Sequence, residues 1–576
     1  MEQETKNTHI DWALAFGSVA AAFADTAKHF PEHPVIDVLK ETAEIYGIAS
    51  GPMSYAALSE RVFYLYDAYY SAGYVHGDRV GLLLENRPDF LEHWLALNTL
   101  GVSVVPISSE MRVAELSYLI AHSEIVLAVA LSSHHELVRE AAAREGCTLN
   151  IIALGDPIPP RLNRPEHADA DAASARRLPS LETECALLYT SGTTGRPKGC
   201  VLSNEYFLFA GGWYLGLGGL CEIHEGTDRL ITPLPLNHMN AMACSTMAML
   251  LSGGCTVLLD RFHPKTWWMS VRESRATILH YLGVMPSMLM LDPVTPEDLK
   301  HQVRFGFGAG VDKRLHQPFE QRFGFPLVEG WAMTETGVAA CIIAHQEPRY
   351  VGTSCFGKPS ADVEIRIVDD EEKDVLPGQN GQLLVRRAGD RPGLGFFDHY
   401  LKDPQASAEA WANGWFHTGD VVQADELSYL HFIDRKKNVI RRSGENISAV
   451  EVETVLRRHP AVKDAAVAAT PDVVRGDEVL ACVILKDEAL QLGGCTDANS
   501  EKVLAQMRGM AEELTRHCLK ELAYFKAPGW VAFVTSLPLT LTQKVQRGEL
   551  KTLALNLPGQ AHCFDTTNLK KREALA

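Results

Sequence analysis

The alternation of short apolar runs with helical segments constrains the fold of this 576-residue chain more than any other feature. Buried-strand patterns occur in DRVGLLLEN, VSVVPIS and IVLAVAL, and segments with helical periodicity separate them. Apolar, β-branched runs that alternate with helices predict a parallel, doubly wound sheet, because each crossover helix covers one face of the sheet. We therefore expect an α/β protein.

The chain is too long for one hydrophobic core, so we expect at least two domains. A large N-terminal domain of doubly wound sheets is expected over residues 1–434. Within it, short strands with Gly and Pro turns after Gly352 predict a small antiparallel β subdomain. The boundary falls at HFIDRKKNVIRRSG, and a smaller α+β C-terminal domain follows it over residues 438–576.

Several local patterns predict particular helices. Residues 8–30 are expected to form one amphipathic helix, and a further helix is expected around residues 499–523. Ser203 and Asn204 can cap the helix of EYFLFAGGWYL. Ser448 and Glu451 have the spacing of a capping box.

The loop LLYTSGTTGRPKG, from Leu187 to Gly199, is the clearest ligand-binding pattern. It offers unhindered backbone N–H groups, several hydroxyl groups and two cationic side chains, which together suit a polyphosphate. It is not a Walker A sequence, because GxxxxGK[ST] is absent. A flexible surface linker is the alternative, but linkers seldom follow a buried strand with such a density of threonine.

Charge and cysteine usage exclude some classes of function. The chain has 72 acidic and 54 basic residues, a net charge of −18, which disfavours binding to nucleic acid or to anionic membranes. No apolar run is long enough to span a bilayer, and acids stand where a signal peptide has bases. The 12 cysteines include no CxxC pair. We therefore expect a cytoplasmic protein with free, buried thiols.

The glycine-rich loop resembles the signature of the adenylate-forming superfamily, which includes acyl-CoA synthetases, peptide-synthetase adenylation domains and luciferases. Further segments match in the family's order: PLPLNHMNA, GWAMTE, WFHTGD, DRKKNVIRRSGENI and PLTLTQK. The resemblance implies ATP, Mg²⁺ and coenzyme A as partners of a small carboxylic acid. The acid attacks the α-phosphate of ATP to give an acyl-adenylate and pyrophosphate, and the thiol of coenzyme A then takes the acyl group. A homo-oligomer is compatible with this reading.

The resemblance also implies roles for individual residues. Thr190 to Lys198 would hold the β- and γ-phosphates, Trp331 would stack on adenine, and Asp420 would accept the ribose hydroxyls. The implied ATP- and AMP-binding residues are Thr190, Ser191, Gly192, Thr193, Thr194, Gly195, Lys198, Gly308, Ala309, Gly310, Glu329, Gly330, Trp331, Ala332, Thr334, Asp420, Arg435 and Lys544. Glu335, with Thr190, would bind Mg²⁺.

Lys544, Glu335, Thr194 and His238 are the implied catalytic residues, with Lys544 neutralising charge at the α-phosphate. The acyl pocket would be lined by His238, Met239, Met242, Gly308 and Ala332. Ala332 suggests a pocket that is neither closed at two carbons nor as wide as the widest known.

The C-terminal domain would rotate between the two half-reactions at a hinge over residues 435–437, with Lys437 as the residue about which it turns. Arg441, Ser443, Gly444 and Glu445 would then line the path of coenzyme A. Some relatives have an arginine at the position of Asn446, and it contacts the phosphate in the thioester-forming state. Asparagine has no charge, so the resemblance does not imply how this chain holds the phosphate in that state.

Four alternatives stay open at this point. Stretches such as RATILHYLGVMPSMLM look most like carnitine/crotonobetaine-type CoA ligases, yet the pocket segment has no clear acid to pair a trimethylammonium group. A free-standing adenylation enzyme that loads an acyl carrier protein is a second reading. A non-catalytic acyl-nucleotide sensor is a third, although a sensor would not need Lys544. A luciferase-type oxidation shares the same motifs.

Overall fold

The computed structural model describes residues 2–162, 177–190, 197–435, 439–486, 501–538 and 545–571. The chain divides into two compact units. Unit 1 comprises Met1–Ser109, Ile120–Tyr189 and Gly199–Asp434, and unit 2 comprises Glu110–Leu119, Thr190–Lys198 and Arg435–Ala576. In the part of the chain that the structure describes, no helix is both long enough and apolar enough to cross a bilayer.

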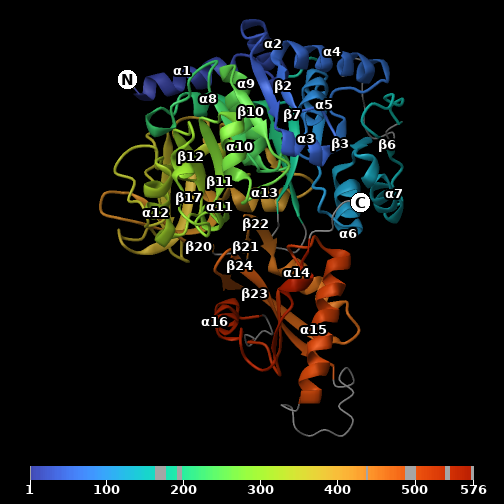
Figure 1. Ribbon diagram of the computed structural model, residues 1–576, viewed down its shortest axis with the longest axis vertical. Coiled ribbons are helices and arrows are strands. Elements are labelled where there is room, and N and C mark those ends of the chain that lie inside the picture. The colour runs from blue at the N-terminus through green and yellow to red at the C-terminus, as the bar shows by residue number, and fades with distance from the viewer. Residues whose placement is uncertain are drawn as a thin grey trace. The chain divides into compact units, whose positions relative to one another are not determined.

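An eight-stranded sheet positions most of the predicted site residues of unit 1. Figure 1 labels several of its strands, among them β10, β11 and β12. In spatial order its strands are β14 (Gly337–Ile343), β13 (Leu327–Met333), β12 (Phe305–Ala309), β11 (Ile278–Leu282), β9 (Arg229–Thr232), β10 (Cys255–Leu258), β1 (Pro34–Val38) and β2 (Gly51–Ser54). The strands from β13 to β1 pair in parallel, and the two edge strands, β14 and β2, pair antiparallel. This is the expected α/β arrangement.

A second sheet, of seven strands, carries the glycine-rich loop. Its strands in order are β18 (His399–Tyr400), β8 (Lys198–Ser203), β7 (Glu184–Thr190), β4 (Ser103–Pro106), β3 (Arg79–Leu83), β5 (Leu127–Ala130) and β6 (Asn150–Ile152). Strands β3, β4, β5, β6 and β7 pair in parallel. The three apolar runs named from the sequence are β3, β4 and β5, as predicted.

The predicted antiparallel subdomain is a five-stranded sheet. Its order is β15 (Cys355–Gly357), β20 (Leu430–Arg435), β19 (Phe416–Ala424), β17 (Asn380–Arg387) and β16 (Val363–Val368). The pairings of β15 with β20, β17 with β19 and β16 with β17 are antiparallel.

Helices cover these sheets and fill the space next to them. They are α1 (Glu2–Leu14), α2 (Val19–His29), α3 (Lys40–Tyr46), α4 (Tyr55–Ser71), α5 (Pro88–Thr99), α6 (Val113–Ser123), α7 (His135–Arg144), α8 (Asn204–Leu215), α9 (Thr246–Ser252), α10 (Trp267–Ser274), α11 (Val284–Leu289), α12 (Lys313–Phe323) and α13 (Pro404–Ala410). Helix α8 is apolar on all sides and buried along its length, as a helix in the core of a large protein must be.

Unit 2 is built on one further sheet. Its strands are β22 (Glu445–Ser448), β21 (Val439–Arg442), β24 (Gly476–Leu485), β25 (Trp530–Phe533) and β26 (Cys563–Asp565), and β23 (Val462–Asp472) also pairs with β24. Its helices are α14 (Ala449–Arg457), α15 (Glu501–Glu521) and α16 (Arg547–Asn556). The predicted helix at 499–523 is α15. The hinge at 435–437 stays a prediction, because residues 436–438 lie outside the described ranges.

One local prediction was wrong and two hold in part. The single helix over 8–30 is two helices, because Gly17 adopts φ +74° and Ser18 caps α2 by accepting from the N–H of Ala21. Ser203 stands at the N-cap position of α8, as predicted, but its side chain makes no capping hydrogen bond. Asn204 is the first residue of the helix, and its Oδ1 accepts from the backbone N–H of Val19 at 3.1 Å. Ser448 caps α14 as predicted, whereas the Glu451 carboxylate pairs with Lys526.

Candidate active site

The carboxyl ends of four neighbouring parallel strands gather at one edge of the eight-stranded sheet. Strands β9, β11, β12 and β13 are adjacent in the order β13-β12-β11-β9. His238 follows β9, Gly310 follows β12, and Thr334 and Glu335 follow β13. Ligands of open parallel sheets bind at this edge, so the topology brings these predicted residues to a suitable place.

The GAG run at residues 308–310 ends β12, and its glycines have structural causes. A Cβ on Gly308 would lie 2.2 Å from the carbonyl oxygen of Tyr281 on β11, so only glycine permits this pairing. Gly310 adopts φ +80°, in the left-handed region that favours glycine. Contact of this run with adenine stays a prediction.

Glu329 fixes the loop that follows β12. Its carboxylate accepts hydrogen bonds from the N–H of Gly310 at 3.1 Å, the N–H of Val311 at 3.2 Å and the hydroxyl of Tyr281 at 2.9 Å. Burial raises the pKa of Glu329, and these hydrogen bonds oppose that rise. The resemblance implied nucleotide binding at Glu329 and did not reveal these hydrogen bonds of its side chain. An acid within the apolar segment FPLVEGW was the available signal for its side chain.

Asp420 on β19 lies against Trp331 on β13. Trp331 Nε1 donates to Asp420 Oδ2 at 2.9 Å, and both side chains are buried. The sheet of the β subdomain thus supplies Asp420, the residue predicted to bind the ribose, and the large sheet supplies Trp331, the residue predicted to stack on adenine. The contact orients the carboxylate through the indole N–H, a link that sequence motifs do not reveal. Stacking of Trp331 on adenine stays a prediction.

Glu335 is buried and receives a hydrogen bond from Tyr400. The Tyr400 hydroxyl donates to Glu335 Oε1 at 2.8 Å, and the Glu335 carbonyl accepts from the N–H of Phe397 at 2.9 Å. Burial and the neighbouring carboxylate raise the pKa of Tyr400, so it remains a donor. The hydroxyl of Tyr206 on α8 donates to the carbonyl of Thr334 at 2.9 Å. No sequence pattern had singled out either tyrosine.

The phosphate loop is described only at its ends. Thr190 ends β7 and Lys198 begins β8. Ser191, Gly192, Thr193, Thr194 and Gly195 lie outside the described residues, as do Lys437 and Lys544. Arg435 ends β20, and its side chain is likewise not described. The roles predicted for these residues stay predictions.

The segment after β9 carries the residues predicted for the acyl pocket. His238 is exposed, Met239 and Met242 are buried, and Ala332 on β13 is half-buried. Residues Asn240–Ser245 form a π-helix that leads into α9, which the sequence did not predict. Short π-helical turns are rare and often occur at functional sites.

In unit 2, the turn predicted to line the coenzyme A path joins β21 to β22. Ser443 has φ +51° and Gly444 has φ +91°. The N–H of Ser443 donates to the Arg475 carbonyl at 2.9 Å, and the N–H of Arg441 donates to Asp477 Oδ2 at 3.2 Å. The start of β24 therefore fixes the position of this turn.

Known families match both parts of the chain. The AMP-binding enzyme family matches residues 23–393, more than half of the chain. The chain belongs to the AMP-binding enzyme family. The family of AMP-binding enzyme C-terminal domains matches residues 451–544. The chain is accordingly an AMP-forming acid–thiol ligase, which uses ATP and Mg²⁺ to activate a carboxylic acid and coenzyme A to accept it.

Individual relatives are similar in sequence or in fold. Crotonobetaine/carnitine–CoA ligases of Salmonella, among them that of Salmonella typhi, are 29% identical over 525 residues, which cover 89% of this chain and 96% of theirs. A mutant o-succinylbenzoate CoA synthetase from Bacillus subtilis has the same fold, with a TM-score of 0.74 and 23% identity over 92% of this chain and 98% of its own. An amide bond synthetase from Marinactinospora thermotolerans has a TM-score of 0.73 and 24% identity over 93% of this chain and all of its own.

The residues of this AMP-binding enzyme fit a magnesium ion that ATP brings with it. Tyr400 occupies Glu335 Oε1, and in the described part of the chain no donor is bonded to Oε2. The described residues contain no group of three or more His, Cys, Asp or Glu that could hold a metal. Mg²⁺ commonly binds through one or two carboxylates and completes its shell with water and phosphate oxygens, so a single free carboxylate oxygen suits it.

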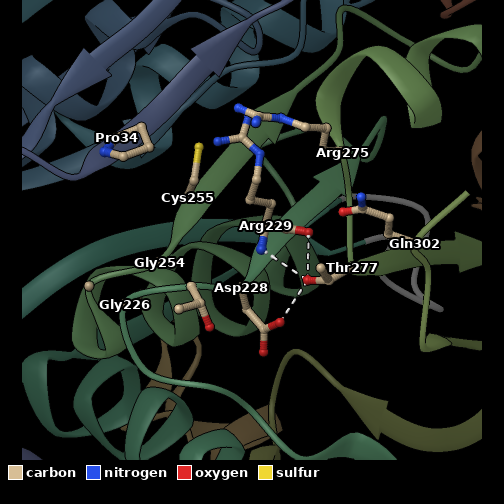
Figure 2. A pocket seen from close by; sticks show the side chains of 11 residues that line it. Pro34, Gly226, Asp228, Arg229, Gly254, Cys255, Arg275, Thr277 and Gln302 are labelled. Atoms are coloured by element: carbon tan, nitrogen blue, oxygen red, sulfur yellow. Dashed lines mark hydrogen bonds between the residues drawn. The ribbon is translucent and has the colours of Figure 1, made fainter.

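A cavity of about 300 Å³ lies at the opposite, amino-terminal edge of the large sheet (Figure 2). Its lining includes Pro34, Arg229 and Cys255, which are the first residues of β1, β9 and β10, and Thr277, which precedes β11. None of the predicted ATP, acyl or coenzyme A residues lines it. This cavity is therefore separate from the candidate active site.

Proposed function

We propose that the predicted residues divide the reaction of this ligase into three tasks. Residues Thr190 to Lys198 hold the β- and γ-phosphates, and Glu335 would hold a Mg²⁺ ion, which would neutralise part of the phosphate charge. Asp420, oriented by Trp331, accepts the ribose hydroxyls. Lys544 neutralises the charge that builds up between the carboxylate of the acid and the α-phosphate. The observation that carries this proposal is the set of contacts made by Glu329, Trp331, Asp420 and Glu335 at one sheet edge.

The physical problem of the first step is the repulsion between two anions. Positioning and fixed positive charge solve it, because they stabilise the charge that develops in the transition state. Buried carboxylates are useful here only if they bind a cation or accept hydrogen bonds from the nucleotide. Tyr400 donates to one oxygen of Glu335 and Trp331 donates to one oxygen of Asp420, so each carboxylate is held in a fixed orientation.

The second step requires the thiol of coenzyme A to approach the adenylate. We propose that unit 2 alternates between two positions, with Lys544 serving the first step and the Ser443–Gly444 turn serving the second. Lys437 is the proposed centre of the hinge between residues 435 and 437. Gly444 has no side chain that could block an approach to the backbone of this left-handed turn, which supports a role in admitting the pantetheine chain.

The proposed substrate is a small carboxylic acid without a quaternary ammonium group. The Salmonella relatives are crotonobetaine/carnitine–CoA ligases by name. Of the five residues proposed to line the acyl pocket here (His238, Met239, Met242, Gly308 and Ala332), none is a carboxylate that could pair with such a cation. We also propose a cytoplasmic location, where ATP and coenzyme A are both available.

Separate assays of the two half-reactions test these assignments. Lys544→Ala is expected to lose pyrophosphate release from acid and ATP, yet still convert supplied acyl-AMP and coenzyme A to thioester. Gly444→Phe is expected to do the reverse. Matched controls in the same unit are Lys520→Ala, at an exposed site on α15, and Gly559→Phe, which also replaces a glycine of positive φ. Equal loss of both half-reactions in Lys544→Ala would contradict the division of tasks.

A further inference from the structure

A chain of hydrogen bonds runs from the core of unit 1 to the carboxyl edge of the large sheet. His280 on β11 is fully buried, and its Nε2 lies 3.0 Å from the hydroxyl of Tyr214 on α8. On the other side of the ring, Nδ1 lies 2.8 Å from Ser245 Oγ and 2.8 Å from Asn240 Oδ1. Tyr214 and Ser245 are also buried, whereas Asn240 is half-buried. Asn240 therefore forms the outer end of the chain.

The surroundings of His280 fix the position of its proton. Burial lowers the pKa of His280 to about 3, so the ring is neutral and carries one N–H. The Ser245 hydroxyl donates to the Asn240 carbonyl at 3.2 Å, which leaves its oxygen as an acceptor. Asn240 Oδ1 can only accept. Both neighbours of Nδ1 are acceptors, so Nδ1 carries the hydrogen and Nε2 accepts from Tyr214.

Ser245 alone already places the hydrogen on Nδ1, so the Asn240 amide must present its oxygen atom to His280. Its Oδ1 turns inward to His280, so its Nδ2, with two N–H donors, turns away from the core. Among the described residues, none accepts a hydrogen bond from Nδ2. Buried polar atoms are costly unless they are paired. A network that only stabilised the core would therefore end on a buried partner. This one ends on a half-buried pair of donors.

The place of Asn240 in the fold suggests what these donors bind. Asn240 is the first residue of the π-helix, and it comes shortly after His238 in the segment that follows β9. Gly310 follows β12 and Glu335 follows β13 at the same edge of the sheet. In the sequence Asn240 comes after His238 and Met239 and before Met242, three residues that are proposed above to line the acyl pocket. The Asn240 side chain is held by buried His280, which Tyr214 and Ser245 hold in turn. A side chain supported in this way is well suited to select among substrates, because little reorganisation is needed on binding.

We propose that Asn240 donates a hydrogen bond to an oxygen atom on the acyl chain, and that the substrate is an acid bearing a hydroxyl, keto or amide oxygen besides its carboxylate. The proposal rests on the adenylating function proposed above. His280 and Tyr214 are positioning residues in this account, since they act through Asn240. A cationic group at the same place would face two N–H donors and would be disfavoured.

Matched acids can test this selectivity. The probes are butanoate, its 2-, 3- and 4-hydroxy derivatives and 3-oxobutanoate, assayed by pyrophosphate release. Sites that hydrogen-bond a substrate group discriminate strongly against the analogue that lacks it. We expect wild-type kcat/KM for at least one oxygenated acid to exceed that for butanoate by about tenfold or more, which corresponds to one hydrogen bond.

Asn240→Asp is the sharpest variant because it has nearly the same shape. It keeps an acceptor for the His280 Nδ1–H but replaces both donors with an acceptor oxygen. We expect the preference for the oxygenated acid to fall at least tenfold relative to butanoate. Asn240→Leu removes all polar contact of the side chain and serves as the second variant, without the added charge. We expect its kcat/KM for the oxygenated acid to fall at least tenfold relative to its kcat/KM for butanoate.

Tyr214→Phe tests the positioning role. It removes the donor to His280 Nε2, so the amide of Asn240 is held less firmly, and we expect a smaller, severalfold loss of the preference. Tyr69→Phe is the matched control. The Tyr69 hydroxyl lies 2.7 Å from Nδ1 of buried His93, so this variant also removes a buried tyrosine–histidine hydrogen bond. Its selectivity should equal that of the wild type.

The outcomes separate this inference from the proposed function. Wild-type preference for butanoate over every oxygenated acid would overturn the inference, as would an equal loss on all acids in both Asn240 variants. Thioester formation in those cases would leave the proposed function intact. Failure of the wild type to release pyrophosphate with any acid would instead contradict the proposed function itself.

Discussion

Glu335, the predicted magnesium ligand, and Tyr400, which donates a hydrogen bond to it, form the most testable pair of residues. Glu335→Gln keeps the shape of the side chain but removes its charge, so we expect pyrophosphate release to fall at least about a hundredfold. Tyr400→Phe leaves the carboxylate in place without its donor and should reduce the rate by about tenfold, the value of one hydrogen bond to a charged group. Titration of the activity with Mg²⁺ measures both effects.

Restoration of the Tyr400→Phe activity by high Mg²⁺ is the expected control, since the hydroxyl only orients the carboxylate. Insensitivity of both variants to the Mg²⁺ concentration would contradict the assignment of Glu335. Tyr206→Phe is not a suitable control because that hydroxyl binds the neighbouring Thr334 carbonyl.

Trp331 offers a second test at the scale of one residue. Trp331→Phe retains an aromatic face but loses the N–H that donates to Asp420 Oδ2. The carboxylate is then less well oriented for the ribose hydroxyls, and we expect KM for ATP to rise by about tenfold with little change in KM for the acid. Initial-rate kinetics with each substrate varied separately will measure this. An equal rise in both KM values would argue for a general loss of structure.

At the scale of elements, Gly308 controls the pairing of β11 with β12. Gly308→Ala places a methyl group 2.2 Å from the Tyr281 carbonyl oxygen, and the two strands must separate to accept it. We expect the free energy of unfolding to fall by about 1–3 kcal/mol, as for other overpacked sites. Urea denaturation of the purified variants is the measurement.

Gly509→Ala is the matched control, and it is expected to raise the free energy of unfolding where Gly308→Ala lowers it. Gly509 lies within α15 and is exposed, and a Cβ added there would have no other atom within 4 Å. Alanine there should stabilise the helix by about 0.5–1 kcal/mol, because glycine is the weaker helix former. A destabilising Gly509→Ala, or a neutral Gly308→Ala, would contradict this account of the two glycines.

The elements that sequence reasoning identified best are those set by local pattern. Strands β3, β4 and β5 are apolar runs, and α15 has clear helical periodicity, so both kinds were predictable. Gly17 and Ser18 divide the predicted helix at 8–30 because a left-handed residue followed by an N-cap ends one helix and begins another. The pattern of apolar residues continues through that break and conceals it.

The partners of the site residues were not predictable in the same way. The resemblance pointed to Glu335, Asp420 and Trp331, yet the hydrogen bonds that orient them join residues distant in sequence. Tyr400 lies 65 residues from Glu335, and Trp331 lies 89 residues from Asp420. Similarly, the capping potential of Asn204 was evident, but its competing bond to Val19, 185 residues away, depends on tertiary packing.

At the scale of whole units, unit 2 contains a buried cluster of charged side chains. Glu478 accepts from Arg442 Nε at 2.7 Å and from the ammonium group of Lys570, and all three side chains are buried. Burial, followed by repulsion from Arg442, lowers the pKa of Lys570 from its usual 10.5 to about 7. The unfolded chain therefore binds a proton between these pH values that the folded protein does not.

The sign of the resulting pH dependence follows from linkage. Stability rises with pH wherever the unfolded state binds more protons, so Lys570 should make unfolding less favourable as the pH rises from about 7 toward 10. Lys570→Met abolishes this contribution. We expect the wild-type free energy of unfolding to increase relative to that of Lys570→Met between about pH 7 and 9.5, measured by urea denaturation. A difference that stays constant over this range would contradict the lowered pKa.

The central claim is that this ligase forms an acyl-adenylate and passes its acyl group to coenzyme A. The most direct measurement is pyrophosphate release across a panel of carboxylic acids, with and without coenzyme A, combined with detection of the thioester. We predict that at least one acid releases pyrophosphate without coenzyme A, and that its acyl-AMP becomes acyl-CoA and AMP when coenzyme A is added. Pyrophosphate release with no thioester formed from any acid would contradict the account and favour the loading of a carrier protein.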